Sequence, residues 1–185
     1  MCRFALPTIA TAALLTLAGC GTPSQTVPMT LSPVDALQIR GWVPAMLKAS
    51  VAVAPVNGGA ETGRWWGSKV SAVALQQALE ESLFAVGMHP LAPDPEPRYE
   101  LQAELLALEQ PLVPVRGATV GVAVRYTLVD RIAGKVVYQR RVANAEEARF
   151  SESMLSPSER LRIANERALR ANINRLLREL VTLAP

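Results

Sequence analysis

The arrangement in this sequence that best suits acid–base chemistry is formed by His89 and Asp94. His89 is the only histidine of the 185-residue chain, and the aspartate follows five positions later, so a base and a carboxylate that could orient it are available. Such a pair would suit an enzyme that acts on a lipid or a glycan. Pro90, Pro93 and Pro95 flank it, however, and predict a surface loop between a helix and a strand. We therefore interpret the segment as a connection and expect a protein that is not an enzyme.

A glycine-flanked loop offers a second possibility for chemistry. Gly58 and Gly63 have the spacing of the glycines in a phosphate-binding loop, but Arg64 stands where such a loop needs lysine and Trp65 where it needs a hydroxyl group. A nucleotide site is therefore not expected. Adjacent tryptophans are more typical of a binding anchor, because indole rings dominate interaction hot spots. We predict that Arg64, Trp65 and Trp66 contact a partner; the alternative is that one indole ring caps the core.

The remaining polar residues do not assemble into a metal or cofactor site. Glu100 and Glu104 alternate with Gln102 on one face of a predicted strand, which favours a solvent-facing row over an acid–base pair. The chain has no calcium-loop pattern, and no metal or cofactor is expected. Nucleic acid is not expected as a partner either, because aromatic residues that could stack on bases are not interleaved with the basic ones.

The N-terminus has the features of a targeting signal. Arg3 is followed by an apolar run from residue 4 to residue 17, which is too short for a membrane span and suits a signal peptide. The tetrapeptide at residues 17–20, Leu-Ala-Gly-Cys, resembles the lipobox of bacterial lipoproteins. The resemblance implies a signal peptide over residues 1–19, which contains Cys2, and acylation of Cys20, which leaves the mature chain no free thiol. Gly21 is not the aspartate that retains such proteins in the inner membrane, so the resemblance implies the periplasmic face of the outer membrane.

The rest of the chain divides into a tether and one domain. Residues 20–34 are rich in proline, threonine and serine with almost no charge, and predict a flexible tether behind the lipidated cysteine. Residues 35–185 have the composition of a folded domain, since half of the whole chain is apolar and 19% is charged. We expect a single periplasmic domain of α/β type.

Hydrophobic periodicity predicts the elements of this domain. Alternation with a period of two indicates strands, and apolar residues three and four positions apart indicate helices. The expected elements are a strand over residues 50–56, a helix over 68–86 that ends at Gly87, an uncertain short strand near 87–91, strands over 99–107, 120–128 and 136–145, and a helix that begins after Ser156.

The last helix has a clear start and a clear apolar face. Ser156 fits an N-cap, and Glu159 three residues later completes a capping box. Asn165 and Asn172 fall inside the apolar arc and therefore need hydrogen-bond partners, whereas Arg160 falls on the opposite, polar arc. The element order, β-α-(β)-β-β-β-α, predicts an α+β fold with a mixed, mostly antiparallel sheet and two main helices packed on one of its faces.

Residues 120–130, followed by Gly134 and Lys135, complete a pattern that resembles a known group. The strand, the glycine-rich loop, the helix, the three strands and the capped helix are similar to small envelope lipoproteins with a domain like the N-terminal domain of TolB, including YajG-type and curli-secretion-type lipoproteins. The resemblance implies a non-enzymatic protein that docks onto an envelope protein or complex. A weaker resemblance, to auxiliary lipoproteins of lipid-transporting ABC systems, implies contact with a transport complex and stays open beside it.

Overall fold

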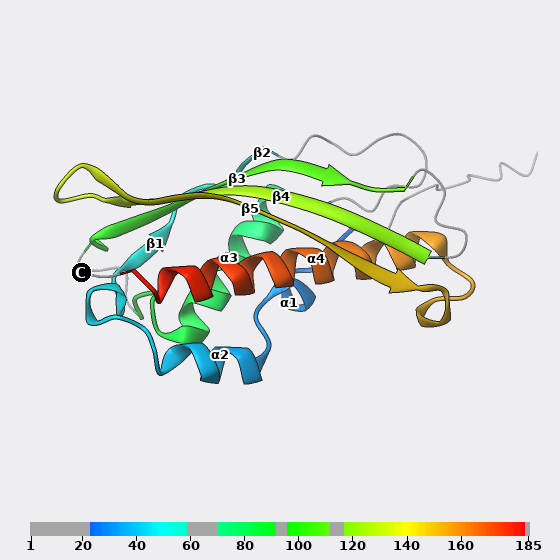
Figure 1. Ribbon diagram of the computed structural model, residues 1–185, viewed down its shortest axis with the longest axis horizontal. Coiled ribbons are helices and arrows are strands. Elements are labelled where there is room, and N and C mark those ends of the chain that lie inside the picture. The colour runs from blue at the N-terminus through cyan, green and yellow to red at the C-terminus, as the bar shows by residue number, and fades with distance from the viewer. Residues whose placement is uncertain (1–22, 59–69, 92–95, 112–116, 184–185) are drawn as a thin grey trace, which may run out of the picture.

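A computed structural model describes residues 23–58, 70–91, 96–111 and 117–183. In these parts of the chain the protein is an α+β fold in which one curved mixed sheet lies on one side and the helices lie on the other (Figure 1). The strands are β1 (Val51–Val53), β2 (Asn57–Gly58), β3 (Tyr99–Glu109), β4 (Gly117–Asp130) and β5 (Lys135–Arg149). The helices are α1 (Thr26–Met29), α2 (Pro33–Arg40), α3 (Ala72–Val86) and α4 (Pro157–Leu180), with short 3-10 turns at Ala45–Leu47 and Phe150–Glu152.

The sheet has the strand order β1-β3-β4-β5, and β2 also pairs with β3. Both short strands run parallel to β3, whereas β3, β4 and β5 form an antiparallel meander. In β4 the even-numbered residues from Ala118 to Leu128 are buried against the helices, as expected from their period of two. The predicted antiparallel strands are confirmed, and all three are longer than the sequence indicated.

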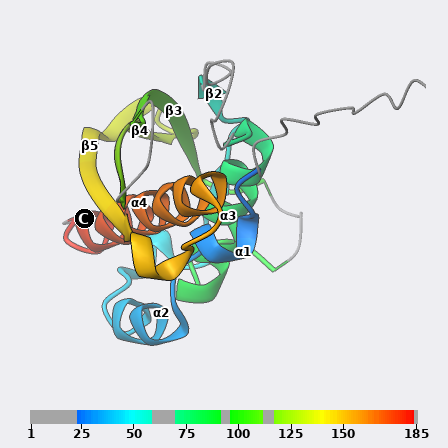
Figure 2. The same cartoon turned by 90° about the vertical axis from the view of Figure 1, so that its right-hand side faces the viewer.

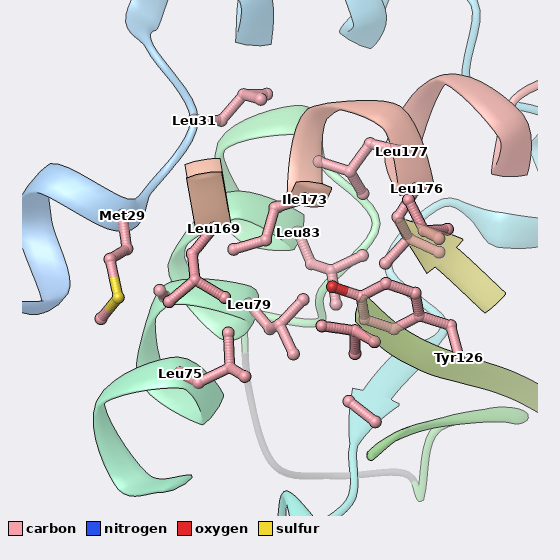
Figure 3. Packing of buried hydrophobic residues seen from close by; sticks show 14 of the residues in the cluster. Met29, Leu31, Leu75, Leu79, Leu83, Tyr126, Leu169, Ile173, Leu176 and Leu177 are labelled. Atoms are coloured by element: carbon pink, nitrogen blue, oxygen red, sulfur yellow. The ribbon is translucent and has the colours of Figure 1, made fainter. Parts of the chain in front are cut away.

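Helices α3 and α4 cover the inner face of the sheet. Leucines from both helices meet Tyr126 of β4 in the core, as Figure 3 shows, and Leu79, Leu83 and Leu169 are fully buried there. Helix α3 ends at Gly87 as predicted, because that residue has a φ of 80°, which costs a residue with a Cβ atom free energy. Helix α4 begins at the predicted N-cap, where the Ser156 hydroxyl accepts a hydrogen bond from the backbone of the third helical residue.

Both asparagines inside the apolar arc of α4 have partners, and Oδ1 of Asn165 accepts from Nε2 of Gln110 at 2.7 Å. Asn172 donates from Nδ2 to the carbonyl of Val142 at 3.0 Å and to Oδ1 of Asn144 at 2.7 Å, and its own Oδ1 accepts from the Tyr126 hydroxyl at 2.9 Å. Burial raises the pKa of Tyr126 far above its usual range, so the hydroxyl stays a donor. The network fixes the register of α4 on β4 and β5.

The prediction of a short strand near residues 87–91 is wrong. The backbone N–H of Met88 donates to the carbonyl of Leu83 at 2.9 Å, which completes the end of α3 and leaves that group unavailable for a sheet. The segment contacts the start of β1 through carbonyls alone: that of Gly87 accepts from Ala49 at 3.0 Å, and that of Met88 accepts from Ser50 and Val51 at 2.9 and 3.0 Å. The segment is therefore irregular backbone that links α3 to the sheet.

The folded part of the chain begins earlier than residue 35. Helix α1 lies inside the segment that was expected to be a tether, and Met29 at its end is 0% exposed. The backbone N–H of Gln25 donates to Oε1 of Glu166 in α4 at 2.8 Å. The composition of this segment resembles a linker, but Met29 and Leu31 bury enough apolar surface to hold it against α3 and α4.

Candidate docking surface on the outer face of the sheet

Most residues that the sequence singled out cannot be placed. Cys20, Arg64, Trp65, Trp66 and Asp94 lie outside the described residues. His89 is described and half-buried, and its Nδ1 atom lies 2.9 Å from the carbonyl oxygen of Pro90. The pairing of His89 with Asp94 is therefore untested, and the contact with Pro90 is one that a connecting loop makes.

The start of the glycine-flanked loop is described and is fixed against β3. Gly58 pairs with Leu105 and has a φ of 82°. A Cβ atom at this position would lie 2.5 Å from the Leu105 carbonyl oxygen, so that only glycine fits. The last described residue before Arg64, Trp65 and Trp66 therefore lies beside the middle of β3.

The outer face of β3, β4 and β5 is not covered by any of the described helices (Figure 2). A row of charged residues crosses it, because Glu104, Arg125 and Arg141 occupy neighbouring positions on the three strands. Arg125 donates to Oε2 of Glu104 at 2.7 Å. Both of these side chains are about half exposed, so the pair contributes little to stability and leaves Arg141 directly opposite a like charge.

A shallow hollow lies beside this charged row. Its volume is about 370 Å³, and it opens to solvent on the outer face of the sheet. The walls consist mainly of small residues at aligned positions of the three strands, namely Ala107, Gly121, Ala123, Ala143 and Ala145, and Glu109 and Arg141 supply opposite charges at its rim. Because no wall residue projects far from the backbone, a side chain or an extended segment of a partner can approach the strands closely.

The floor of the hollow is rigid. Asn144, which also lines it, donates to the carbonyl of Ala168 in α4 at 2.9 Å and accepts from Asn172. Hydrogen bonds to buried groups of this kind hold the strands in one position. The hollow is thus a preformed feature of the sheet.

The sequence indicated the strands but not the hollow. Gly121 and Ala123 alternate with the valines of β4, so periodicity places them on the less apolar face without indicating that this face is hollowed. A run of glycine and alanine at alternating positions in two adjacent strands, here residues 121–123 and 143–145, is the signal that could have identified it.

The carboxylates on the same face have structural partners. Glu100 accepts a hydrogen bond from Gln102 at 2.9 Å, and Glu104 is paired with Arg125. The interpretation of this row as a solvent-facing set of side chains is confirmed for Glu104, which is 46% exposed.

A second charged group lies where β5 ends and is held together by its own ion pair. Arg167 of α4 pairs with Glu152, which also accepts from the backbone N–H of Arg149 at 2.7 Å. Together these donors lower the pKa of Glu152 to about 2, with the arginine as the main cause. The ion pair between Arg167 and Glu152 holds the 3-10 turn against α4, so both charges already have partners within the domain.

Two further features concern the described residues as a whole. No cluster of three or more histidine, cysteine, aspartate or glutamate side chains in the described ranges could hold a metal ion. None of the helices in those ranges combines the length and the apolar character that crossing a membrane requires.

Comparison with known proteins identifies the fold. No protein-family model matches the chain, and no curated protein matches it. Among solved structures, a Xanthomonas campestris protein assigned to the DUF330 family has a TM-score of 0.56 at 13% identity, covering 75% of this chain and 89% of that one. A predicted lipoprotein from Caulobacter crescentus CB15 has a TM-score of 0.52 at 12% identity, covering 78% and 93%. A hypothetical protein from Chlamydia trachomatis has a TM-score of 0.50 at 14% identity, covering 74% and 99%.

At these identities the similarity shows the fold alone. The chain has a fold that is also found in a predicted bacterial lipoprotein and in a protein of the DUF330 family. The finer assignment to the group with a TolB-like domain stays a prediction.

Proposed function

We propose that the protein is a non-enzymatic, lipid-anchored envelope protein. Its periplasmic domain docks onto a protein or a transport complex. The lipid is attached to Cys20, and the anchor lies on the periplasmic face of the outer membrane. The sequence at residues 17–20 and the fold shared with bacterial lipoproteins support the anchor.

The observation that carries the docking role is the outer face of the sheet. Three long strands expose one face on which none of the described helices packs, and a hollow with alanine and glycine walls lies between Glu109 and Arg141. In an α+β domain the helices pack on one face of the sheet, and the other face is free to meet a partner. A partner that brings an extended segment with complementary charges fits the hollow.

The loop that carries Arg64, Trp65 and Trp66 belongs to the same proposal. Its first described neighbour, Gly58, is fixed beside Leu105, two residues before the first wall residue of the hollow. A partner seated on the outer face therefore lies within reach of the loop, so that the tryptophans add contacts at the rim of the docked surface.

The test is the loss of a partner when the hollow is filled. The protein is extracted gently from its own envelope, and proteins that co-purify in near-stoichiometric amounts are identified by mass spectrometry. Ala143→Arg places a long side chain in the hollow, whereas Gln139→Arg adds the same side chain to an exposed position of the same strand outside it. We expect the partner to be lost in the first variant and retained in the second. Equal retention in both variants, with circular dichroism unchanged, contradicts the docking surface.

A further inference from the structure

The distance between the lipid and the domain is limited by the fold. This inference rests on the proposed acylation of Cys20. Ser24 is buried, and Gln25 is hydrogen-bonded to Glu166, so the chain is already part of the domain four residues after the cysteine. Four residues span at most about 14 Å even when fully extended. A domain on so short a connection stays in contact with the headgroups of the bilayer, and one of its faces must meet them.

Helix α2 exposes apolar residues on its outward face. Val34 and Leu37 lie one turn apart and are well exposed, whereas Ala36 and Ile39 are buried on the opposite face against the domain. Trp42 follows directly after the helix and is 77% exposed. Exposed apolar side chains that gather in one short segment mark an interaction surface more often than scattered ones do.

A second exposed apolar group lies in the loop between β5 and α4. Leu155 is 98% exposed, and Met154 beside it is also well exposed. The loop has a defined shape, because the Arg160 guanidinium lies 5.0 Å from the centre of the Phe150 ring beneath it and donates to the carbonyl of Ser153.

Helix α2 lies on the side of the molecule away from the outer face of the sheet, and the β5–α4 loop lies at the end of the sheet where β5 stops. In Figure 1 the helices lie below the sheet, with α2 at the bottom, the 3-10 turn of the β5–α4 loop at the right, and α1 between them. Figure 2 agrees, since α2 and this turn again lie away from the outer face of the strands. The chain that leads back to Cys20 leaves from the start of α1, which is hydrogen-bonded to α3 and α4.

We infer that α2 and the β5–α4 loop rest on the phospholipid bilayer to which Cys20 is anchored. Tryptophan and leucine favour the membrane interface, and Arg40 and Lys48, both exposed on either side of Trp42, suit the anionic headgroups of phosphatidylglycerol. A bilayer is the occupant that the anchor favours, because Cys20 lies only four residues before the buried Ser24. The contact orients the domain so that the outer face of the sheet points into the periplasm.

The first test uses Trp42 as a reporter. The chain contains three tryptophans, so Trp65→Phe together with Trp66→Phe leaves Trp42 as the only one. The lipidated protein is reconstituted into vesicles of phosphatidylethanolamine and phosphatidylglycerol, either with or without bromine atoms on the upper acyl carbons. We expect about a twofold loss of Trp42 emission in the brominated vesicles, because an interfacial apolar face lies roughly 5–10 Å into the boundary between headgroups and acyl chains. Equal emission in both kinds of vesicle overturns the inference.

The second test does not alter the tryptophans. An acylated Cys20 leaves no free thiol in the mature chain, so Leu155→Cys introduces a single site for an environment-sensitive fluorophore. Gln139→Cys, which is exposed on the outer face of the sheet, is the matched control. We expect the label at position 155 to be quenched by brominated lipid and the label at position 139 to be unaffected. Equal quenching at both positions, or a label at position 155 that brominated lipid does not quench, overturns the inference.

Two measurements detect loss of the lipid anchor separately from loss of the membrane contact. Vesicle flotation and thiol labelling of the wild-type protein report on Cys20 alone. A protein that floats with the vesicles but shows no quenching retains its anchor and loses the α2 contact. A wild-type protein that does not float with the vesicles and that reacts with a thiol reagent overturns both the anchor and the contact that rests on it.

Discussion

Replacing Met29 by alanine separates a folded N-terminal segment from a flexible tether. The Met29 side chain is 0% exposed and lies in the core beside leucines of α3 and α4 (Figure 3). Truncation to alanine removes its apolar contacts and leaves a cavity, and for a fully buried methionine the cost is about 2–5 kcal/mol. Since domains of this size have unfolding free energies of about 5–15 kcal/mol, the loss is a large part of the total.

The assay is urea denaturation followed by circular dichroism on a form of the chain that begins at Gly21. Val27→Ala is the control, because Val27 lies two residues earlier in the same short helix and is 72% exposed. We expect Val27→Ala to change the unfolding free energy by less than about 0.5 kcal/mol, as exposed substitutions usually do. The midpoint for Met29→Ala falls to lower urea with an unchanged slope.

A Met29→Ala variant that is as stable as the Val27→Ala control would refute this reasoning. Helix α1 would then be detached from the domain in solution, and residues 20–34 would form a tether as their composition suggests. The distance between the lipid and the domain would no longer be limited, and the orientation of the domain on the bilayer would lose its physical basis.

Three other predictions concern the sheet and its network. Tyr126→Phe leaves the buried side-chain Oδ1 of Asn172 without its donor and is expected to lower the unfolding free energy by about 1–3 kcal/mol. Tyr138→Phe is expected to cost less, because Glu179, which accepts from the Tyr138 hydroxyl, is partly exposed and keeps Arg175 as a donor. Burial raises the pKa of Tyr126 above its ordinary value of 10.0, so above that pH the unfolded chain releases a proton that the folded chain keeps. Stability therefore falls as the pH rises further, and urea titrations at alkaline pH should show a shallower fall in Tyr126→Phe. Gly134→Ala, at a φ of 62° in open space, is expected to cost about 1–2 kcal/mol. Gly58→Ala costs more in the same titration, because its Cβ atom meets a β3 carbonyl at 2.5 Å and displaces β2; equal losses would contradict this geometry.

The elements with strong periodicity were predictable because local sequence decides them. Strands β3 and β4 alternate with a period of two over most of their length, and β5 follows β4 after a turn that contains Gly134. Helix α4 has a serine N-cap with a glutamate three residues later. Asn172 was recognised as a buried polar residue in need of partners, and it has them. Each of these features is determined by the sequence of a single segment.

The features that were missed depend on contacts between distant segments. Arg160 falls on the polar arc of α4, but it is buried because the β5–α4 loop folds over it and places Phe150 against its guanidinium. The hollow exists because the register of three strands aligns Ala107, Ala123 and Ala143, and a shift of one residue would turn these side chains to the other face. Such alignment cannot be read from the composition of any single strand.

The central claim, that the outer face of the sheet docks a partner, is tested most directly by photo-cross-linking in the native envelope. A benzophenone amino acid replaces Ala145 in the hollow, and in a second strain it replaces Lys48, which is exposed on the helical side. The account predicts a discrete protein adduct from position 145, and lipid adducts without that protein from position 48. The same protein adduct from position 48 alone, with none from position 145, would contradict it.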